Sequence, residues 1–154
     1  MSMMKKNSFL LVLTMITLSA SVWGQKAVDK ADILLVPEWK QIYDAYIPDD
    51  ASIVSLRNKV PGLRADVYFG TWCDDSKNNV PLFLKIIDTL HVPEFKVNFY
   101  TVEKKSTTGQ KYFVADMLVE KVPTFIFFIG DIEIGRIIEN PKDSILQDML
   151  QILL

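Results

Sequence analysis

Residues 65–76 read Ala-Asp-Val-Tyr-Phe-Gly-Thr-Trp-Cys-Asp-Asp-Ser and join a predicted strand to a predicted helix. The first five residues are rich in β-formers and Gly70 ends the run, which is typical of a short strand. Apolar residues then recur every three or four positions from Val80 to Leu90, which predicts a helix. Cys73 therefore falls at a strand-to-helix junction.

Further strands and helices are predicted on both sides of this junction. In chain order we expect helices at 37–46 and 51–59, the strand at 65–69, the helix that ends at Leu90, a strand at 97–102, a polar loop at 104–109, a helix at 112–121, strands at 124–129 and 132–138, and a last helix capped by Asp143 or Ser144. A β-α-β unit implies parallel neighbours, and the Gly130-Asp131 turn adds an antiparallel pair. The expected fold is α/β, a four-stranded mixed sheet with helices on both faces.

The N-terminus has the features of a secretory signal peptide. Lys5 and Lys6 precede a mostly apolar run at 9–20, and Val22 and Gly24 stand third and first before a possible cleavage point. The run is shorter than the ~20 apolar residues that a membrane-spanning helix needs. A buried N-terminal helix is the alternative interpretation.

With cleavage there, the sequence predicts three segments. We expect a signal peptide at 1–24, a partly helical N-terminal extension at 25–50 and a single domain at 51–154. The mature protein would be periplasmic or secreted, with no membrane attachment after cleavage. The extension either packs on the edge of the sheet or binds a partner.

Composition excludes several classes of function. The chain has 154 residues, is 49% hydrophobic and carries a formal net charge of −2, so it can bury a core and lacks the basic excess of nucleic-acid-binding proteins. It has one cysteine, Cys73, and one histidine, His91, which excludes an intrachain disulfide and a four-ligand Cys/His zinc site. We expect no metal and no cofactor. The predicted helix, from Lys77 to Leu90, separates these two residues by about 20 Å, which disfavours a Cys-His catalytic pair.

Three features of the chain resemble the thioredoxin family over about residues 50–154. Trp72-Cys73 lies at a strand-to-helix junction, as the family's W-C-x-x-C motif does. Val122-Pro123-Thr124 precedes a strand, as the family's cis-proline segment does, and Pro81 occupies the following helix, where many members have a proline.

The resemblance implies thiol–disulfide chemistry at Cys73. A helix N-terminus stabilises a thiolate, which is the attacking species. The resemblance also implies that Val122, beside a cis Pro123, pairs with the extended backbone of a protein client that carries a thiol or a disulfide. Trp72 either shields the thiol and contacts the client or only packs on the strand end.

The chain departs from the family's motif in three places. Ser76 replaces the second cysteine, so release of a mixed disulfide needs an external thiol such as glutathione or a partner protein. Asp74 and Asp75 suit a helix N-terminus but disfavour ionisation of a neighbouring thiol, an effect that Lys77 opposes. The family's buried aspartate six residues before the cysteine is replaced by valine, and the adjacent Asp66 should face the other side of the sheet.

These residues predict a monothiol thiol–disulfide oxidoreductase or isomerase with Cys73 as nucleophile. Ser76 either hydrogen-bonds the thiolate or only supports the start of the helix. The rival hypothesis is a binding or chaperone-like module of the cell envelope that keeps the fold but forms no covalent intermediate. A thiol peroxidase is a third possibility, which Gly70 disfavours because the family's peroxidase branch has threonine at that position.

Overall fold

The computed structural model describes residues 25–104, 112–114 and 117–154. The predicted signal peptide at 1–24 lies outside the described residues, as does most of the predicted loop at 104–109. Among the described residues, no helix combines the length and the apolar character needed to cross a bilayer.

The fold is α/β and is built on a five-stranded mixed sheet. In spatial order its strands are β1 (Gln25–Val28), β3 (Lys96–Val102), β2 (Leu63–Phe69), β6 (Thr124–Ile129) and β7 (Ile132–Ile138). β2 and β3 are parallel, and the other neighbouring pairs are antiparallel. The expected mixed sheet is therefore present, but with one more strand, because residues 25–28 pair with β3 at the sheet edge. A stretch of four residues is too short to show the alternation that identifies a strand.

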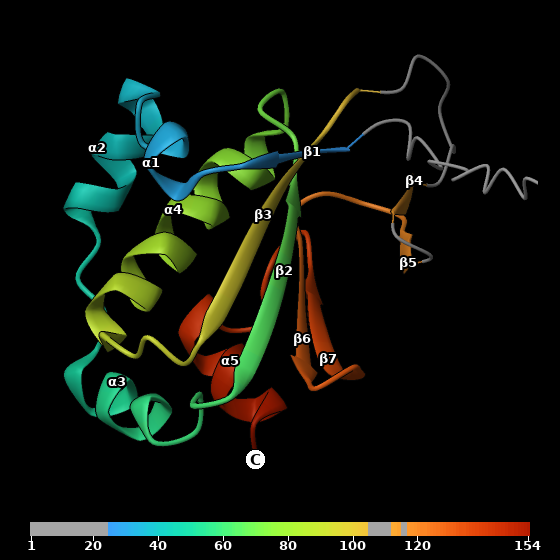
Figure 1. Ribbon diagram of the computed structural model, residues 1–154. Coiled ribbons are helices and arrows are strands. Elements are labelled where there is room, and N and C mark those ends of the chain that lie inside the picture. The colour runs from blue at the N-terminus through green and yellow to red at the C-terminus, as the bar shows by residue number, and fades with distance from the viewer. Residues whose placement is uncertain (1–24, 105–111, 115–116) are drawn as a thin grey trace, which may run out of the picture.

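The helices of the described residues all lie on one face of this sheet (Figure 1). They are α1 (Lys30–Ile33), α2 (Pro37–Ala45), α3 (Asp50–Arg57), α4 (Asp74–Leu90) and α5 (Ile145–Ile152). Each buries side chains in one cluster, the main core, together with Ala65, Val67 and Phe69 of β2. The segment at 25–50 contributes β1, α1 and α2 to the same sheet and core.

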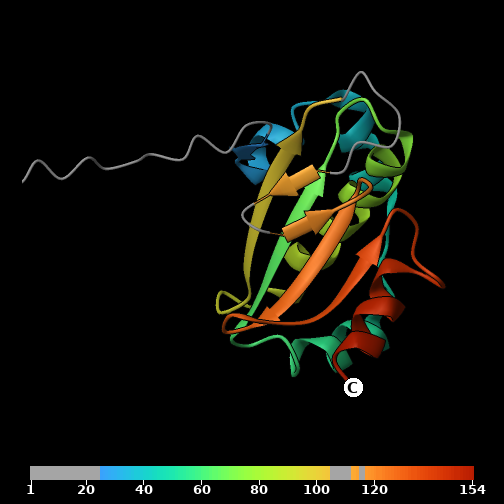
Figure 2. The ribbon, with the colours of Figure 1, turned by 90° about the vertical axis from the view of Figure 1, so that its right-hand side faces the viewer.

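The prediction of helices on both faces is wrong for the described residues. The predicted helix at 112–121 is instead an antiparallel pair of short strands, β4 (Tyr112–Val114) and β5 (Met117–Val119), in front of the other face in Figure 2. The sequence Tyr-Phe-Val consists of β-formers, and in the antiparallel pair its preference outweighs the helical spacing of a short apolar stretch. A second, smaller hydrophobic cluster, the second core, lies on this face and consists of Tyr68, Val102, Val119, Val122, Ile126 and Phe128.

Helix α4 runs from Asp74 to Leu90 and carries the centre of the main core. It begins three residues before the predicted start at Lys77 and continues through Pro81. Phe83, fully buried on this helix, contacts three phenylalanines of the sheet, with ring centroids 6.4 Å from Phe99, 5.1 Å from Phe125 and 6.3 Å from Phe127.

We expect Phe83→Ala to lower the free energy of unfolding by about 3–5 kcal/mol, because it leaves a cavity among three aromatic rings. Urea unfolding followed by circular dichroism measures this change. The control Ile132→Ala alters a side chain that is 72% exposed and should stay within about 0.5 kcal/mol of the wild type. Similar losses in the two variants would contradict the assigned core.

Candidate functional site

Cys73 lies where β2 has ended and α4 begins. It is the N-cap residue of α4, but its side chain makes no capping hydrogen bond. The half-buried thiol instead donates to the carbonyl oxygen of Val122, with 3.1 Å between Sγ and O, and packs against the second core. The thiol is therefore hydrogen-bonded to the segment before β6 and caps none of the N–H groups of α4. This hydrogen bond requires the proton on sulfur.

The segment before β6 forms the other wall of the site. Val122 and Pro123 are both buried and are joined by a cis peptide bond, as the resemblance implied. Thr124 secures the segment locally, since its hydroxyl donates to the carbonyl of Lys121 over 2.7 Å. The structure thus brings Cys73 into direct contact with the predicted client-binding segment, but the Val122 carbonyl already has the thiol as its donor.

Trp72 covers the end of β2. Its indole Nε1 donates to the carbonyl of Val102 over 3.0 Å, and the ring lies so close to Gly70 that a Cβ there would be 2.6 Å from Cε2. The side chain is nevertheless 40% exposed, and Lys104 lies over its ring. Trp72 therefore packs on the strand end and also presents an apolar surface next to Cys73.

Ser76 is fully buried in the first turn of α4. Its hydroxyl accepts a hydrogen bond from the Gly70 N–H over 3.2 Å. This contact ties the strand end to the helix start, which agrees with the supporting role considered for Ser76.

The acidic residues of the first turn have different surroundings. Asp74 is exposed, whereas Asp75 accepts a hydrogen bond from the Asn140 side chain over 3.1 Å. Lys77 forms an ion pair with Glu38 of α2, with 2.6 Å between Nζ and Oε2. Their hydrogen bond lowers the pKa of Glu38 and raises that of Lys77. The Lys77 ammonium group is therefore paired with Glu38 of α2 rather than directed to the thiol.

The sequence analysis missed three residues near the site, namely Asn79, Glu139 and Asn140. Asn79 of α4 is buried, and its Nδ2 donates to the backbone carbonyl of Glu139 and to Oδ1 of Asn140, each over 3.1 Å. The Glu139 N–H in turn donates to the carbonyl of Pro123 over 2.7 Å. Asparagine inside a predicted helix was the available signal, because it is a poor helix former unless its amide has a specific partner.

The remaining candidate residues lie away from the thiol. Asp66 is buried on the opposite face from Val67, as predicted, where it pairs with Arg64 and accepts from Asn98. His91 follows the last residue of α4, at the end opposite to Cys73. No group of three or more His, Cys, Asp or Glu side chains that could hold a metal occurs within the described ranges.

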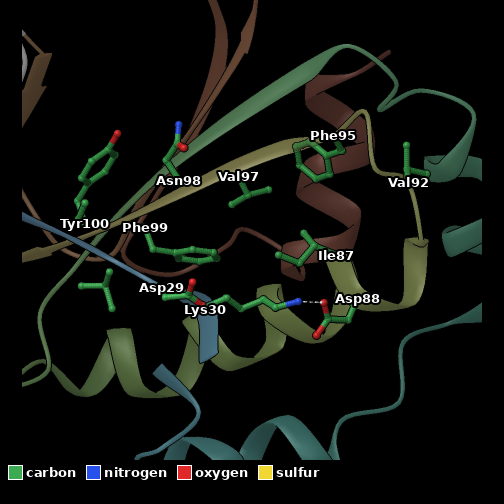
Figure 3. Close-up of a pocket in the computed structure, with 12 residues that line it drawn as sticks. Asp29, Lys30, Ile87, Asp88, Val92, Phe95, Val97, Asn98, Phe99 and Tyr100 are labelled. Carbon is green, nitrogen blue, oxygen red and sulfur yellow. Dashed lines mark hydrogen bonds and ion pairs between the residues drawn. The ribbon is translucent and has the colours of Figure 1, made fainter. Parts of the chain in front are cut away.

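A cavity of about 440 Å³ lies beside the edge of β3, between β1, α1 and the last turns of α4 (Figure 3). Apolar side chains including Ile87, Phe95 and Val97 line it, and Lys30 pairs with Asp88 across it. Asp88 also accepts from the Tyr43 hydroxyl over 2.8 Å. Because Asp88 comes 15 residues after Cys73 on one helix, roughly 20 Å of helix separates this cavity from the thiol.

Comparisons with known proteins give a likeness of fold. No protein-family model matches the chain, and no curated protein matches it in sequence. The crystal structure of a protein of unknown function from Pseudomonas aeruginosa is similar, with a TM-score of 0.59 and 12% sequence identity, over 82% of this chain and 91% of that chain. At this identity the likeness concerns the fold alone.

We expect Ser76→Ala to lower the free energy of unfolding by about 1–3 kcal/mol, because the buried Gly70 N–H loses its acceptor. The control Ser55→Ala removes an exposed hydroxyl from α3 and should change stability by less than about 0.5 kcal/mol. Chemical denaturation of the two variants measures the difference. Equal stabilities would contradict a supporting role for Ser76.

The Tyr43 hydroxyl makes the stability of the folded protein depend on pH. The pKa of Tyr43 is raised from 10.0 to about 12, mainly by burial and to a smaller extent by the hydrogen bond to Asp88. Above pH 10 the unfolded chain therefore loses this proton while the folded protein keeps it, so stability falls between pH 10 and 12. Tyr43→Phe should show a shallower fall over this interval in pH-dependent urea unfolding. An unchanged slope would contradict the assigned shift.

Proposed function

We propose that this chain is an exported thioredoxin-like protein that exchanges thiols and disulfides through Cys73. The observation that carries the proposal is the contact between Cys73, the N-cap of α4, and the cis Val122–Pro123 segment. A strand-to-helix junction holds a nucleophile opposite a buried turn, and this is the arrangement that the resemblance to thioredoxins implies. The mixed α/β sheet agrees with such a fold.

The proposed reaction begins when the half-buried Cys73 thiol leaves the Val122 carbonyl and gives up its proton to solvent water. The thiolate attacks one sulfur of a client disulfide, so that a bond from Sγ to that sulfur forms and the other client sulfur departs as a thiolate. An external thiolate, from glutathione or a partner protein, then attacks the client sulfur and releases Cys73 as a thiolate. Attack by a second thiolate of the client instead completes an isomerisation.

An external thiol is required because Ser76 occupies the position from which a second cysteine would attack. The hydroxyl of Ser76 is buried and is used by Gly70. Cys73 is unchanged after each complete cycle, so the protein itself is neither oxidised nor reduced. The basic and apolar features of residues 1–24 support export to the periplasm or beyond, where client disulfides occur.

A binding module without covalent chemistry is the second candidate. The observation in its favour is the hydrogen bond from Cys73 to Val122, which occupies the thiol and the carbonyl at once. In this case Trp72 and the Val122–Pro123 segment would hold an extended client without a disulfide intermediate.

We expect the reduced protein to form a mixed disulfide with an unfolded, disulfide-containing test protein, and glutathione to dissolve it. Because Cys73 is the single cysteine, Cys73→Ser should abolish the adduct completely. Non-reducing electrophoresis and mass spectrometry measure both steps, with Ser55→Ala as an unaffected control. The covalent function is refuted if the denatured chain forms the adduct and the folded protein does not. Client binding retained by Cys73→Ser would then favour the binding module.

A further inference from the structure

The hydrogen bonds around Cys73 form a closed ring that begins and ends on α4. The thiol donates to the carbonyl of Val122, and the next carbonyl along the chain, that of Pro123, accepts from the Glu139 N–H over 2.7 Å. The Glu139 carbonyl accepts from Nδ2 of Asn79, over 3.1 Å. Since Cys73 and Asn79 belong to the same helix, the ring fixes the position of the Val122 carbonyl relative to the helix start.

Asn79 is the side chain that closes this ring. It is 6% exposed, and both N–H bonds of its amide are used, one for Glu139 and one for Asn140. Asn140 then donates to Asp75 in the first turn of α4. Asn79 lies six residues after Cys73, or about 9 Å further along the helix axis, so it does not act on the sulfur directly.

The backbone at Glu139 adds evidence that this contact is constrained. Its φ is +57°, in the left-handed region that residues other than glycine rarely adopt. In this conformation its N–H serves Pro123 and its carbonyl serves Asn79. A residue keeps such a conformation where its surroundings hold it, and here the two backbone hydrogen bonds do so.

We propose that Asn79 is a positioning residue that holds the Val122 carbonyl on the Cys73 thiol and so keeps the nucleophile in a protonated, inactive position. This inference rests on the proposed function only in taking Cys73 as the nucleophile. The thiol must leave the carbonyl before it can react, and release requires movement of that carbonyl or another donor for it. Loss of the Asn79 amide frees the Pro123 segment and releases the thiol more often.

The test is the rate at which iodoacetamide alkylates Cys73 in the folded protein at a single pH. We expect Asn79→Ala to raise the rate about fivefold, the effect of losing the one hydrogen bond, to the Glu139 carbonyl, that closes the ring. Asn140→Ala should raise the rate by a smaller factor, because it removes only one of the two acceptors of Asn79. Asn58→Ala is the matched control: the Asn58 amide donates to the Val54 carbonyl on the exposed side of α3, and its loss should leave the rate unchanged.

Repeating the alkylation in low urea separates positioning from a general loss of stability. Local release of the thiol exposes little surface, so the raised rate should stay constant as urea increases. The inference is overturned if the folded Asn79→Ala protein reacts at the wild-type rate or more slowly. It is also overturned if the increase grows with urea in step with global unfolding.

The exposed variant Asn140→Ala keeps the test decisive if Asn79→Ala does not fold, because an unchanged rate in this variant also overturns the inference. The alkylation does not depend on a client disulfide. Suppose that Asn79→Ala is alkylated faster than the wild type, but that the wild type forms no mixed disulfide. This pair of results supports the positioning role and refutes the proposed function. If the wild type forms the mixed disulfide and Asn79→Ala is alkylated at the wild-type rate, the proposed function is supported and the positioning role is refuted.

Discussion

The antiparallel pairing of β2 with β6 is the constraint on which the rest of the structure depends. Its register places Tyr68 opposite Thr124, so the end of β2 meets the start of β6. The turn that carries Cys73 leaves β2 at this point, and the Val122–Pro123 segment enters β6 at the same point. Both strands are central and almost wholly buried, and a shift of one residue would exchange the side chains of the two cores. The contact between Cys73 and Val122 is therefore a consequence of sheet register.

Hydrogen bonds from side chains hold the backbone around Cys73 in place, and the Cys73 thiol itself has a hydrogen-bond acceptor. Ser76 holds the strand end, Trp72 covers it, and Asn79 reaches the opposite wall through Glu139. The four buried polar side chains of the described residues, Asp66, Ser76, Asn79 and Thr124, each make at least one hydrogen bond. Such bonds offset the desolvation cost of burying a donor or acceptor. A nucleophile hydrogen-bonded to a carbonyl must break this bond before it reacts. The same geometry thus supports a slow, regulated thiol or a binding module, and the two proposed functions differ in whether release occurs.

Sequence reasoning succeeded where one side of an element faces a continuous core. The apolar stripe of α4 and the apolar strands β2 and β6 appeared at nearly their observed positions, because burial imposes a period on the sequence. It failed for β1, which is four residues long, and for residues 112–121, whose few apolar positions suited a helix and a pair of strands equally. This second error also produced the wrong expectation of helices on both faces. At the site, Cys73, Val122 and Pro123 were found from their motif, whereas Asn79 and Glu139 act through contacts that have no fixed spacing in sequence.

The sequence by itself determined that the chain has a core-forming composition, a mixed α/β architecture and a single thiol at a strand-to-helix junction. These properties follow from composition and from periods of two and 3.6 residues, which depend on near neighbours in the chain. Tertiary structure alone decided that the helices gather on one face and that the thiol donates to Val122. It also decided that Asn79 joins the opposite wall of the site. The Cys73–Val122 contact joins residues 49 positions apart, and the Asn79–Glu139 contact joins residues 60 apart. Only packing of the sheet and helices brings such pairs within hydrogen-bonding distance.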